Sequence, residues 1–516
     1  MAEFTLTRYD VTDLNNGAIA DFPVSNPPGW DDITLYYAYA LLNMGWQQSA
    51  DGDTDVTSMW TYSDSPDSYF FQAAMHWWPQ YPSQIPPSPY DERWSHCTHG
   101  PASAEQYFLP WHRLYIYFYE MILRAKVAEI GGPQLWSLPY WNYSYYDGAD
   151  PSAPWTRSNL PWCYSQPTLP GGEVNPLYIG DIAKRGLQPL WPGTQDTMFL
   201  SVTTPYYNQA YGNADYDGFN STLDGSPHGA VHVDVGTGDG QVSGTGWMAS
   251  TVTASFDPIF WMHHAEIDRF WVGWNAAGNP NRTDDTWLNA EDDPMRTTRW
   301  NFWGDADINN VWVCYPGAMV DPANLADTFP YSYQYQDLPT TPAPQPAGTG
   351  TVLESRGGEL EAAAPSGDRR DLASADAPVE LGKEVTSTSV PLPDEAPSIL
   401  EGAPHVTLYL ENVVATGVPG NYEVYLNYPD ADRETSGEVP HYVGLLSGFG
   451  ADHHHEGHDH GISASYDITD LVGYLRGQGE WDESQATVTF VPAGPARAGL
   501  EAVSNMRVGT VRFETS

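Results

Sequence analysis

The chain has 516 residues and a formal net charge of −45. This length predicts two or three domains, and the scarcity of basic residues argues against binding to nucleic acid, whose phosphates need Lys and Arg. A surface rich in carboxylates keeps a protein soluble and apart from its copies through self-repulsion, so we expect a monomer.

No run of about 18 apolar residues occurs, so the sequence predicts no membrane span. The first residues, MAEFTLTRYD, lack the basic and apolar regions of a signal peptide. A cytoplasmic protein, a mature form whose leader was removed, and a protein exported with a partner all remain open. Cys97, Cys163 and Cys314 are too few for a disulfide framework, and we expect Cys163 and Cys314 to be buried as small hydrophobic residues.

The first histidine-bearing elements lie between residues 68 and 126. His76 belongs to the apolar run SYFFQAAMHWWP, which has helical periodicity, and His96 and His99 lie in the loop-like WSHCTHG. His112 lies in FLPWHRLYIYFYEMILRAK, where Pro110 is well placed to begin a helix. Two helices and a loop can therefore bring three imidazoles to one metal.

A second histidine group lies between residues 228 and 274. In PHGAVH, His228 and His232 are spaced i, i+4, so a helix places both imidazoles on one face. The segment 258–274 has helical spacing and carries His263 and His264 on an aromatic-rich face. Three imidazoles with an open position suit copper or zinc better than magnesium or calcium. Two such groups suggest a pair of metals, which can share a reaction that neither could perform alone.

Pro, Ala, Gly and acidic residues dominate positions 338–402, which predicts a linker or a disordered segment between domains at 1–337 and 403–516. Beyond it, HVTLYLENVV, NYEVYLNY, ATVTFVP and MRVGTVRFE alternate with period two, which predicts a small β-sandwich. The tract 453–460 holds five histidines. Both a solvated, weakly metal-binding loop and a site that collects copper for the metal pair are open interpretations.

The residues CTHG, FLPWHR, PHGAVH and DPIFWMHHAEIDRFW resemble the two copper-binding regions of the tyrosinase, catechol oxidase and molluscan haemocyanin family, over about residues 60–335. The stretches NYEVYLNYP, VPHYVGLLSGFG and YDITDLVGYL are similar to the KFDV-type domain of plant polyphenol oxidases. The resemblance implies a mainly α catalytic domain, a four-helix bundle holding a type-3 dicopper centre, and a C-terminal β-sandwich that covers the copper pocket until it is removed or displaced. The implied cofactors are two copper ions, with O2 as co-substrate.

By motif matching, the resemblance assigns one histidine triplet to each copper: His76, His99 and His112 to the first, and His228, His232 and His264 to the second. Relatives with a single histidine in the last motif keep the one four residues before Asp268, so His263 is expected to pack beside the site. Cys97 matches the cysteine that forms a thioether with the ligand histidine, here His99, in fungal tyrosinases, whereas His96 has no such match. Asp268 can reach a ligand imidazole or form a plain salt bridge, and both remain open.

Three further positions are implied to shape the choice of substrate. Gly229 stands where many monophenolase-active relatives carry Asn, Asp224 where the plant pattern has a water-holding Glu, and Thr251 where plant catechol oxidases often place a bulky Phe. The small residue at 251 is expected to leave the copper pocket open. The implied activity is oxidation of o-diphenols to o-quinones, with weak activity on monophenols and an extension to o-aminophenols.

Two functions of other classes remain open on the sequence. A haemocyanin-like oxygen carrier would share the six histidines but have a covered site. A zinc-binding or metal-storage protein would account for the histidine tract at 453–460. Turnover of a catechol with O2 uptake would separate the oxidase from the carrier, and metal analysis would identify the storage protein.

Overall fold

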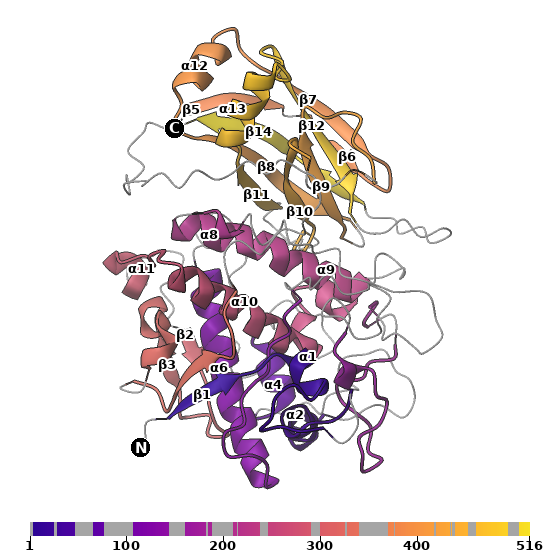
Figure 1. Cartoon of the computed structure of the whole chain (residues 1–516), viewed down its shortest axis with the longest axis vertical. Coiled ribbons are helices and arrows are strands. Elements are labelled where there is room, and N and C mark those ends of the chain that lie inside the picture. Colours follow the sequence, from indigo (N-terminus) through magenta and orange to yellow (C-terminus); the bar gives the residue numbers. More distant parts are fainter. Residues whose placement is uncertain are drawn as a thin grey trace.

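The computed structural model describes residues 4–24, 28–46, 65–76, 97, 107–143, 160–181, 184–187, 210–213, 215–237, 246–289, 300–325, 328–339, 370–375, 377–416, 419–433, 435, 439–451, 461–493 and 505–515. Its elements divide into a helical part before residue 340 and a β part after residue 369 (Figure 1). Each part has its own hydrophobic core. The core of the helical part also includes Leu445 and Phe449 from the β part, so apolar packing joins the two.

The α-helices that shape the helical part are α1 Val11–Asn15, α2 Asp32–Asn43, α4 Tyr69–Ala74, α6 Phe108–Glu129, α8 Tyr216–Leu223, α9 Ala230–Thr237, α10 Ile259–Ala276 and α11 Asp285–Asn289. Short 3-10 turns connect them: η2 Trp162–Tyr164, η4 Trp247–Ala249, η5 Ala254–Phe256, η6 Pro316–Met319 and η7 Pro322–Asn324. Preferred capping residues begin three of the helices, since Asp31, Ser68 and Asp215 accept backbone N–H bonds at the start of α2, α4 and α8.

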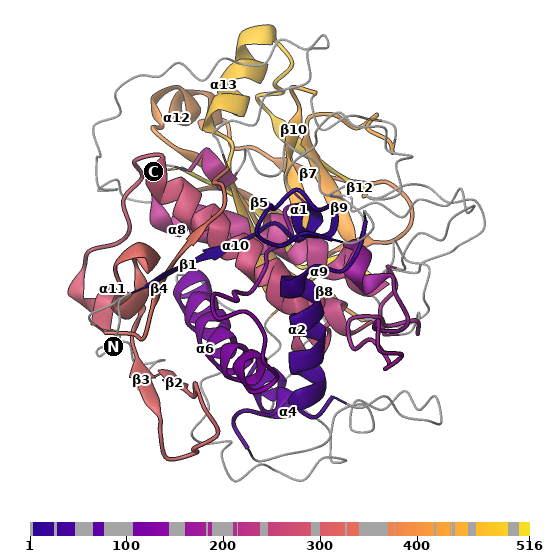
Figure 2. The ribbon, with the colours of Figure 1, turned by 60° about the horizontal axis from the view of Figure 1, so that its bottom comes forward.

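The helix α6 is the central element of the helical part. It packs against α2 and α10, and Figure 2 shows it running beside α2 with the β2–β3 pair on its other side. Nearly all of its side chains from Phe108 to Leu123 are buried. A helix that is apolar on all sides belongs in the interior, which explains why this segment carries His112 into the core.

Between α8 and α9 the chain forms a π-helical segment, η3 (Asp224–Gly229). Ser226 has non-helical dihedral angles, φ −152° and ψ 127°, and Pro227 follows it. Proline cannot donate a backbone hydrogen bond and disrupts the preceding turn, so the helix kinks here. The kink places His228 at the end of η3 and His232 on α9.

The described residues of the helical part also form four short strands, arranged in two pairs. The strands β1 (Thr5–Arg8) and β4 (Ser332–Tyr335) pair in parallel, and β2 (Trp300–Phe302) pairs antiparallel with β3 (Trp312–Cys314). The pairing of β1 with β4 joins the beginning of the described chain to the last strand of the helical part.

The β part contains two sheets around a shared core. One sheet has the order β10-β9-β12-β7, and the other has the order β5-β14-β8-β13-β6 with β11 paired to β8. The elements are β5 Arg370–Ala375, β6 Val379–Leu381, β7 Thr386–Pro391, α12 Ala396–Gly402, β8 Val406–Ala415, β9 Asn421–Leu426, β10 Tyr442–Ser447, β11 Ile462–Asp467, α13 Thr469–Gln478, β12 Gln485–Pro492, β13 Met506–Val508 and β14 Thr510–Thr515. The expectation of a β-rich C-terminal region is confirmed.

The predicted linker is wrong in its second half. Residues 370–402 form β5, β6, β7 and α12 rather than an unstructured segment. Each strand is completed by a distant partner, because β5 pairs with β14, β6 with β13 and β7 with β12. A strand with one buried face needs only a few apolar residues. The composition of residues 370–402 therefore led to the wrong prediction of a linker. Residues 340–369 lie outside the described chain.

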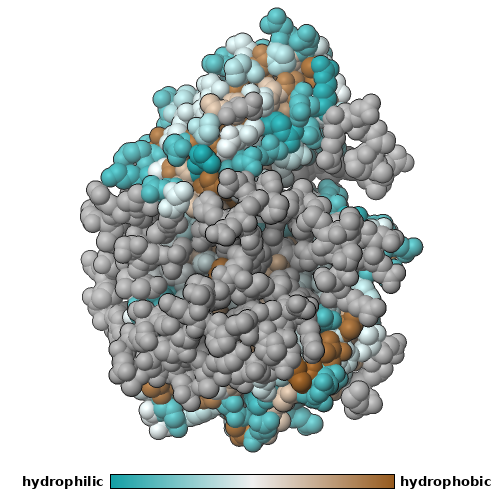
Figure 3. Space-filling view, turned by 180° about the vertical axis from the view of Figure 1, so that it is seen from behind, coloured by the Kyte–Doolittle hydropathy of each residue, from teal (hydrophilic) through white to brown (hydrophobic). Residues whose placement is uncertain are grey.

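The β part sits on the face of the helical part formed by α8, η3 and α9, with β10 and β11 nearest to it (Figure 1). On the side shown in Figure 3, hydrophilic residues prevail over the described surface of the β part, in keeping with the acidic composition. None of the described helices combines the length and apolar character needed to cross a membrane.

Candidate metal centre

The first group of potential metal ligands consists of His76, Cys97 and His112, all buried. His76 directly follows α4, and its Nδ1–H donates to the carbonyl of Thr251 at 2.7 Å. His112 lies on α6, and its Nδ1–H donates to the carbonyl of Phe108 at 2.7 Å. Because a carbonyl only accepts, each neutral ring carries its proton on Nδ1 and keeps the lone pair of Nε2 for a metal.

The second group consists of His228, His232, His263 and His264, also fully buried. His228 Nδ1–H donates to the carbonyl of Asp224 at 2.9 Å, and the Asp224 carboxylate lies 3.1 Å from the same nitrogen. His232 Nδ1–H donates to the carbonyl of Met248 at 2.8 Å. These contacts again leave Nε2 as the available donor atom.

Three imidazoles of the second group, those of His232, His263 and His264, are held in the neutral form. Burial, reinforced by repulsion from His228, lowers the pKa of His232 and of His263 well below the ordinary range. Burial, followed by repulsion from His112, does the same to the pKa of His264. A metal ligand must be deprotonated, so these rings are ready to bind at neutral pH.

The two groups adjoin each other. The rings of His112 and His264 stack with centroids 4.3 Å apart and planes 12° apart. Aromatic side chains enclose the pair, since Phe108 packs on His112 and His228, and Phe260 packs on His76 and His264. The arrangement can hold two neighbouring metal ions in a dry, aromatic-lined site.

The geometry distinguishes His264 from His263. His264 Nε2 lies 3.3 Å from His232 Nε2, whose proton is on its other nitrogen, so a cation between the two lone pairs would relieve their repulsion. His263 instead has its Nδ1 2.7 Å from the Tyr143 hydroxyl. Both rings remain within the four-histidine group, and the choice of His264 as ligand is carried forward as a proposal.

His96 and His99 lie outside the described residues, so the first histidine triplet and the thioether between Cys97 and His99 remain predictions. Cys97 itself is buried in the site, with its Sγ 3.2 Å from His112 Nε2. Cys163 and Cys314 are buried as expected, and burial raises the pKa of both thiols.

Asp268 forms salt bridges and does not bond to His264. Its carboxylate pairs with Arg113 and with Arg8, and it accepts hydrogen bonds from the hydroxyls of Tyr333 and Tyr335. The Arg113–Asp268 pair joins α6 to α10 next to His112 and four residues from His264. Of the two interpretations of Asp268, the salt bridge is the one that the structure contains.

Each of the three substrate-shaping positions contacts the segment 447–450 of the β part or shares a cavity with it. Asp224 and Phe449 line the same cavity, and a Cβ built on Gly229 would lie 2.8 Å from Ser447 Oγ. The Thr251 methyl group lies 3.8 Å from a Cβ built on Gly450. Thr251 is fully buried, and the expectation that it leaves the copper pocket open stays a prediction.

Phe449 covers the second histidine group. Its ring stacks on His232 with centroids 4.0 Å apart and meets His228 edge-on at 5.5 Å. Behind this contact, the side-chain amide of Asn421 donates to the carbonyl of Ala230 at 3.2 Å and to the Asp234 carboxylate at 3.1 Å. Sequence reasoning did not single out either residue, because Asn421 stood only as the first residue of the predicted strand NYEVYLNY and Phe449 only within the stretch VPHYVGLLSGFG.

Comparisons with known proteins agree with this site. Residues 66–277 match the common central domain of tyrosinase, and residues 370–512 match a domain of unknown function (DUF7868). A tyrosinase from Hahella sp. (HcTyr1) is 27% identical over 85% of this chain and 91% of its own length. A chloroplastic polyphenol oxidase of Vitis vinifera is 31% identical, but over 46% of this chain and only 37% of its own.

Among solved structures, latent apple tyrosinase is similar with a TM-score of 0.57 at 20% identity, over 100% of this chain and 98% of that one. At this identity the likeness supports the fold alone. The central-domain match spans the described histidines of both groups, which are His76, His112, His228, His232, His263 and His264. On these grounds residues 66–277 form a tyrosinase central domain, and the chain is similar to tyrosinases and polyphenol oxidases.

Proposed function

We propose that this protein is a type-3 copper oxidase that converts o-diphenols to o-quinones with O2. The observation that carries the proposal is the pair of adjoining groups of buried imidazoles within the tyrosinase central domain. Carboxylates, which magnesium and calcium would need, are not among the described ligands of either group. The residues present therefore fit copper.

We assign His76, His99 and His112 to the first copper and His228, His232 and His264 to the second. Backbone carbonyls orient four of these rings and fix their tautomers. When bound, a copper pair supplies the two-electron redox chemistry that joins O2 reduction to phenol oxidation. The protein's contribution is to orient the ligands and to keep water away through walls such as Phe108 and Phe260.

The substrate ring would lie on the second histidine group, at the face now occupied by Phe449. A phenol needs a flat, apolar surface with a hydrogen-bond acceptor near its hydroxyls, and Asp224 offers a carboxylate beside His228. Gly229 and Thr251 add no bulk there. These features favour diphenols, with monophenols and o-aminophenols as weaker substrates.

We also propose that the β part is a shielding domain and that the protein as described is latent. A phenol cannot reach His232 while Phe449 stacks on it. The domains would be a catalytic unit at about 1–337 and a shield beginning near residue 370, with α4, α6, α9 and α10 forming the four-helix bundle of the catalytic unit.

Copper loading of the full-length chain followed by parallel assays with catechol and phenol tests the function. We expect two coppers per chain and O2 uptake with catechol, which increases after limited proteolysis removes the β part. Reversible O2 binding without turnover in the cleaved protein would favour an oxygen carrier instead. A single bound zinc without a copper pair would favour metal storage.

A further inference from the structure

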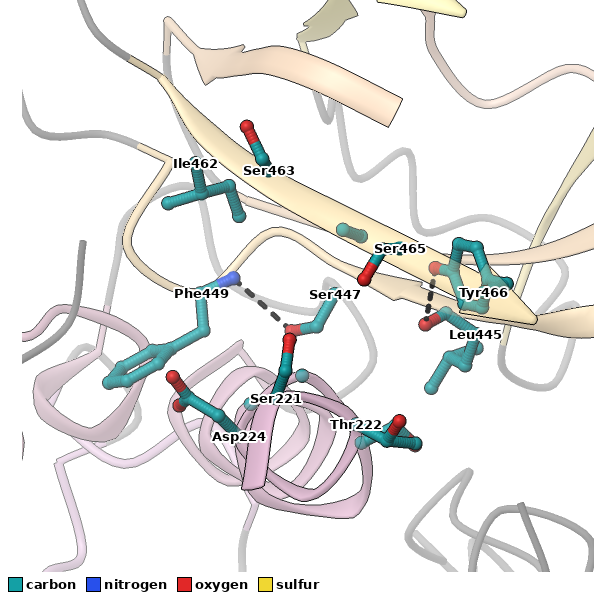
Figure 4. A pocket seen from close by; sticks show the side chains of 14 residues that line it. Ser221, Thr222, Asp224, Leu445, Ser447, Phe449, Ile462, Ser463, Ser465 and Tyr466 are labelled. Atoms are coloured by element: carbon teal, nitrogen blue, oxygen red, sulfur yellow. Dashed lines mark hydrogen bonds between the residues drawn. The ribbon is translucent and has the colours of Figure 1, made fainter. Parts of the chain in front are cut away.

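A cavity of about 80 Å³ lies between the helical part and the β part, beside the metal centre (Figure 4). From the helical part it is lined by residues of α8 and η3, and from the β part by residues of β10, β11 and the segment that follows β10. Phe449 forms one wall, and the same ring stacks on His232. The cavity therefore adjoins the second histidine group, because Phe449 packs on His232 and another lining residue, Asp224, lies beside His228.

The lining combines hydroxyl groups with one carboxylate. Ser221 and Asp224 extend from the helix toward β11, and Ser465 extends from β11 toward them (Figure 4). Ser226 also lines the cavity, and it is 3% exposed with a hydroxyl that has no hydrogen-bond partner among the described residues. A buried polar group without a partner is unfavourable by about 1–3 kcal/mol, so a ligand that bonds to it gains affinity.

The remaining walls are apolar, formed by Leu445, Phe449 and Ile462. A water molecule needs roughly 10–15 Å³ of such space, so the cavity holds on the order of five waters. That is about the size of one aromatic ring with a small substituent. Apolar walls with a few convergent polar groups are typical of sites for small molecules.

We infer that this cavity binds one phenol or diphenol molecule while the β part is docked, in addition to the substrate position on the copper centre. The phenolic hydroxyls donate to Asp224 and bond to the hydroxyls of Ser226 and Ser465, and the ring packs against Phe449 and Leu445. The inference rests on the proposed function, since it assigns the same substrate class to a second site.

Binding at this site favours the docked arrangement of the two parts. A ligand that contacts residues of both parts binds the docked form and not the separated form, so it stabilises the docked form. Phenol bound in the cavity therefore holds Phe449 over His232. High diphenol concentrations are expected to slow oxidation by the full-length protein and not by protein that lacks the β part.

The test uses resorcinol, which has no adjacent hydroxyl pair and cannot form an o-quinone directly. Copper-loaded, full-length protein is titrated calorimetrically without O2. We expect one resorcinol site, and we expect the ring-sized polyol inositol not to bind. Ser465→Leu, which fills the cavity, should weaken binding about tenfold or more, corresponding to about 1.4 kcal/mol. Ser374→Leu is the matched control in the same sheet, because Ser374 on β5 is exposed and does not line the cavity.

Ser226→Ala provides a second variant that adds no bulk, and it should also weaken resorcinol binding, by roughly three- to tenfold from one lost hydrogen bond. Resorcinol binding that is equal in the wild type, Ser465→Leu and Ser226→Ala would overturn the inference, as would an equal loss of binding in Ser374→Leu. Catechol oxidation by protein freed of its β part is measured separately. If that activity is present while resorcinol fails to bind, the cavity assignment alone is wrong, whereas its absence contradicts the proposed function.

Discussion

The ring of Phe449 stacks on the imidazole of His232, with centroids 4.0 Å apart and planes 13° apart. The two residues are 217 positions apart in the sequence. The contact joins the segment after β10 to α9, the helix of the other part of the chain that carries His232. It places an aromatic ring on the face of the histidine group where a phenol would bind. The closed state of the protein thus presents its own side chain in place of a substrate.

Replacing this ring should activate the full-length protein. Phe449→Ala removes a buried aromatic side chain that stabilises docking by roughly 1.5–3 kcal/mol, so we expect catechol oxidation to rise about tenfold or more. Initial rates at equal copper content measure the effect. Ser374→Ala, at an exposed position of the same part that does not line the cavity, serves as the control, and activity unchanged from wild type in Phe449→Ala would contradict the latency proposal.

Gly229 gives a second way to disturb the closed state. A methyl group at this position would lie 2.8 Å from Ser447 Oγ, which accepts a hydrogen bond from the Phe449 backbone N–H at 3.2 Å. Gly229→Ala should therefore push this segment away and accelerate proteolytic release of the β part. Adding Ser447→Gly removes the contacted side chain, so the double variant should return toward the wild-type cleavage rate. Equal cleavage rates in Gly229→Ala and in the double variant would show that the contact between residues 229 and 447 does not govern docking.

Copper stoichiometry decides between the two adjacent histidines of α10. His264→Ala should remove about one copper per chain, because two imidazoles hold copper poorly. His263→Ala should leave both coppers bound and lose the contact with Tyr143 and the stacking on His228. Metal analysis and oxidase assays on both variants measure this, and loss of one copper from His263→Ala alone would reverse the assignment.

The copper-free protein should lose stability as the pH falls below about 6.5, the ordinary pKa of histidine. Burial and neighbouring imidazoles lower the pKa of His232, His263 and His264 in the folded chain, so the unfolded chain binds protons that the folded chain does not. Stability is therefore greatest above this pH and declines below it, by up to about 1.4 kcal/mol per pH unit for each histidine.

Denaturant unfolding of the copper-free chain at pH values from about 7.5 to about 5 measures how the free energy of unfolding changes with pH. These values lie on both sides of the ordinary histidine pKa of about 6.5. Because the glutamine of His263→Gln cannot titrate, unfolding of this variant should take up about one proton fewer, and its free energy of unfolding should change less steeply with pH. A slope equal to that of the wild type would mean that His263 is protonated in the folded state.

The sequence by itself determined the histidine-bearing helices and the similarity to tyrosinases and polyphenol oxidases. The i, i+4 spacing of His228 and His232, and the helical periodicity around His112 and His264, are local patterns, because a helix repeats within a few residues. These patterns sufficed to predict the histidines that the structure brings together, and their binding of copper stays a prediction. The period-two segments after residue 403 predicted strands for the same local reason.

Only the tertiary structure decided which distant groups meet. Residues 370–402 have the composition of a linker, yet their strands form because β12, β13 and β14 supply partners more than 90 positions away. The partners of Asp268, the covering of Thr251 and the position of Phe449 likewise depend on how the two parts pack. Such contacts leave no periodic trace in the chain, since hydrophobic burial is non-directional and is satisfied only by the assembled fold.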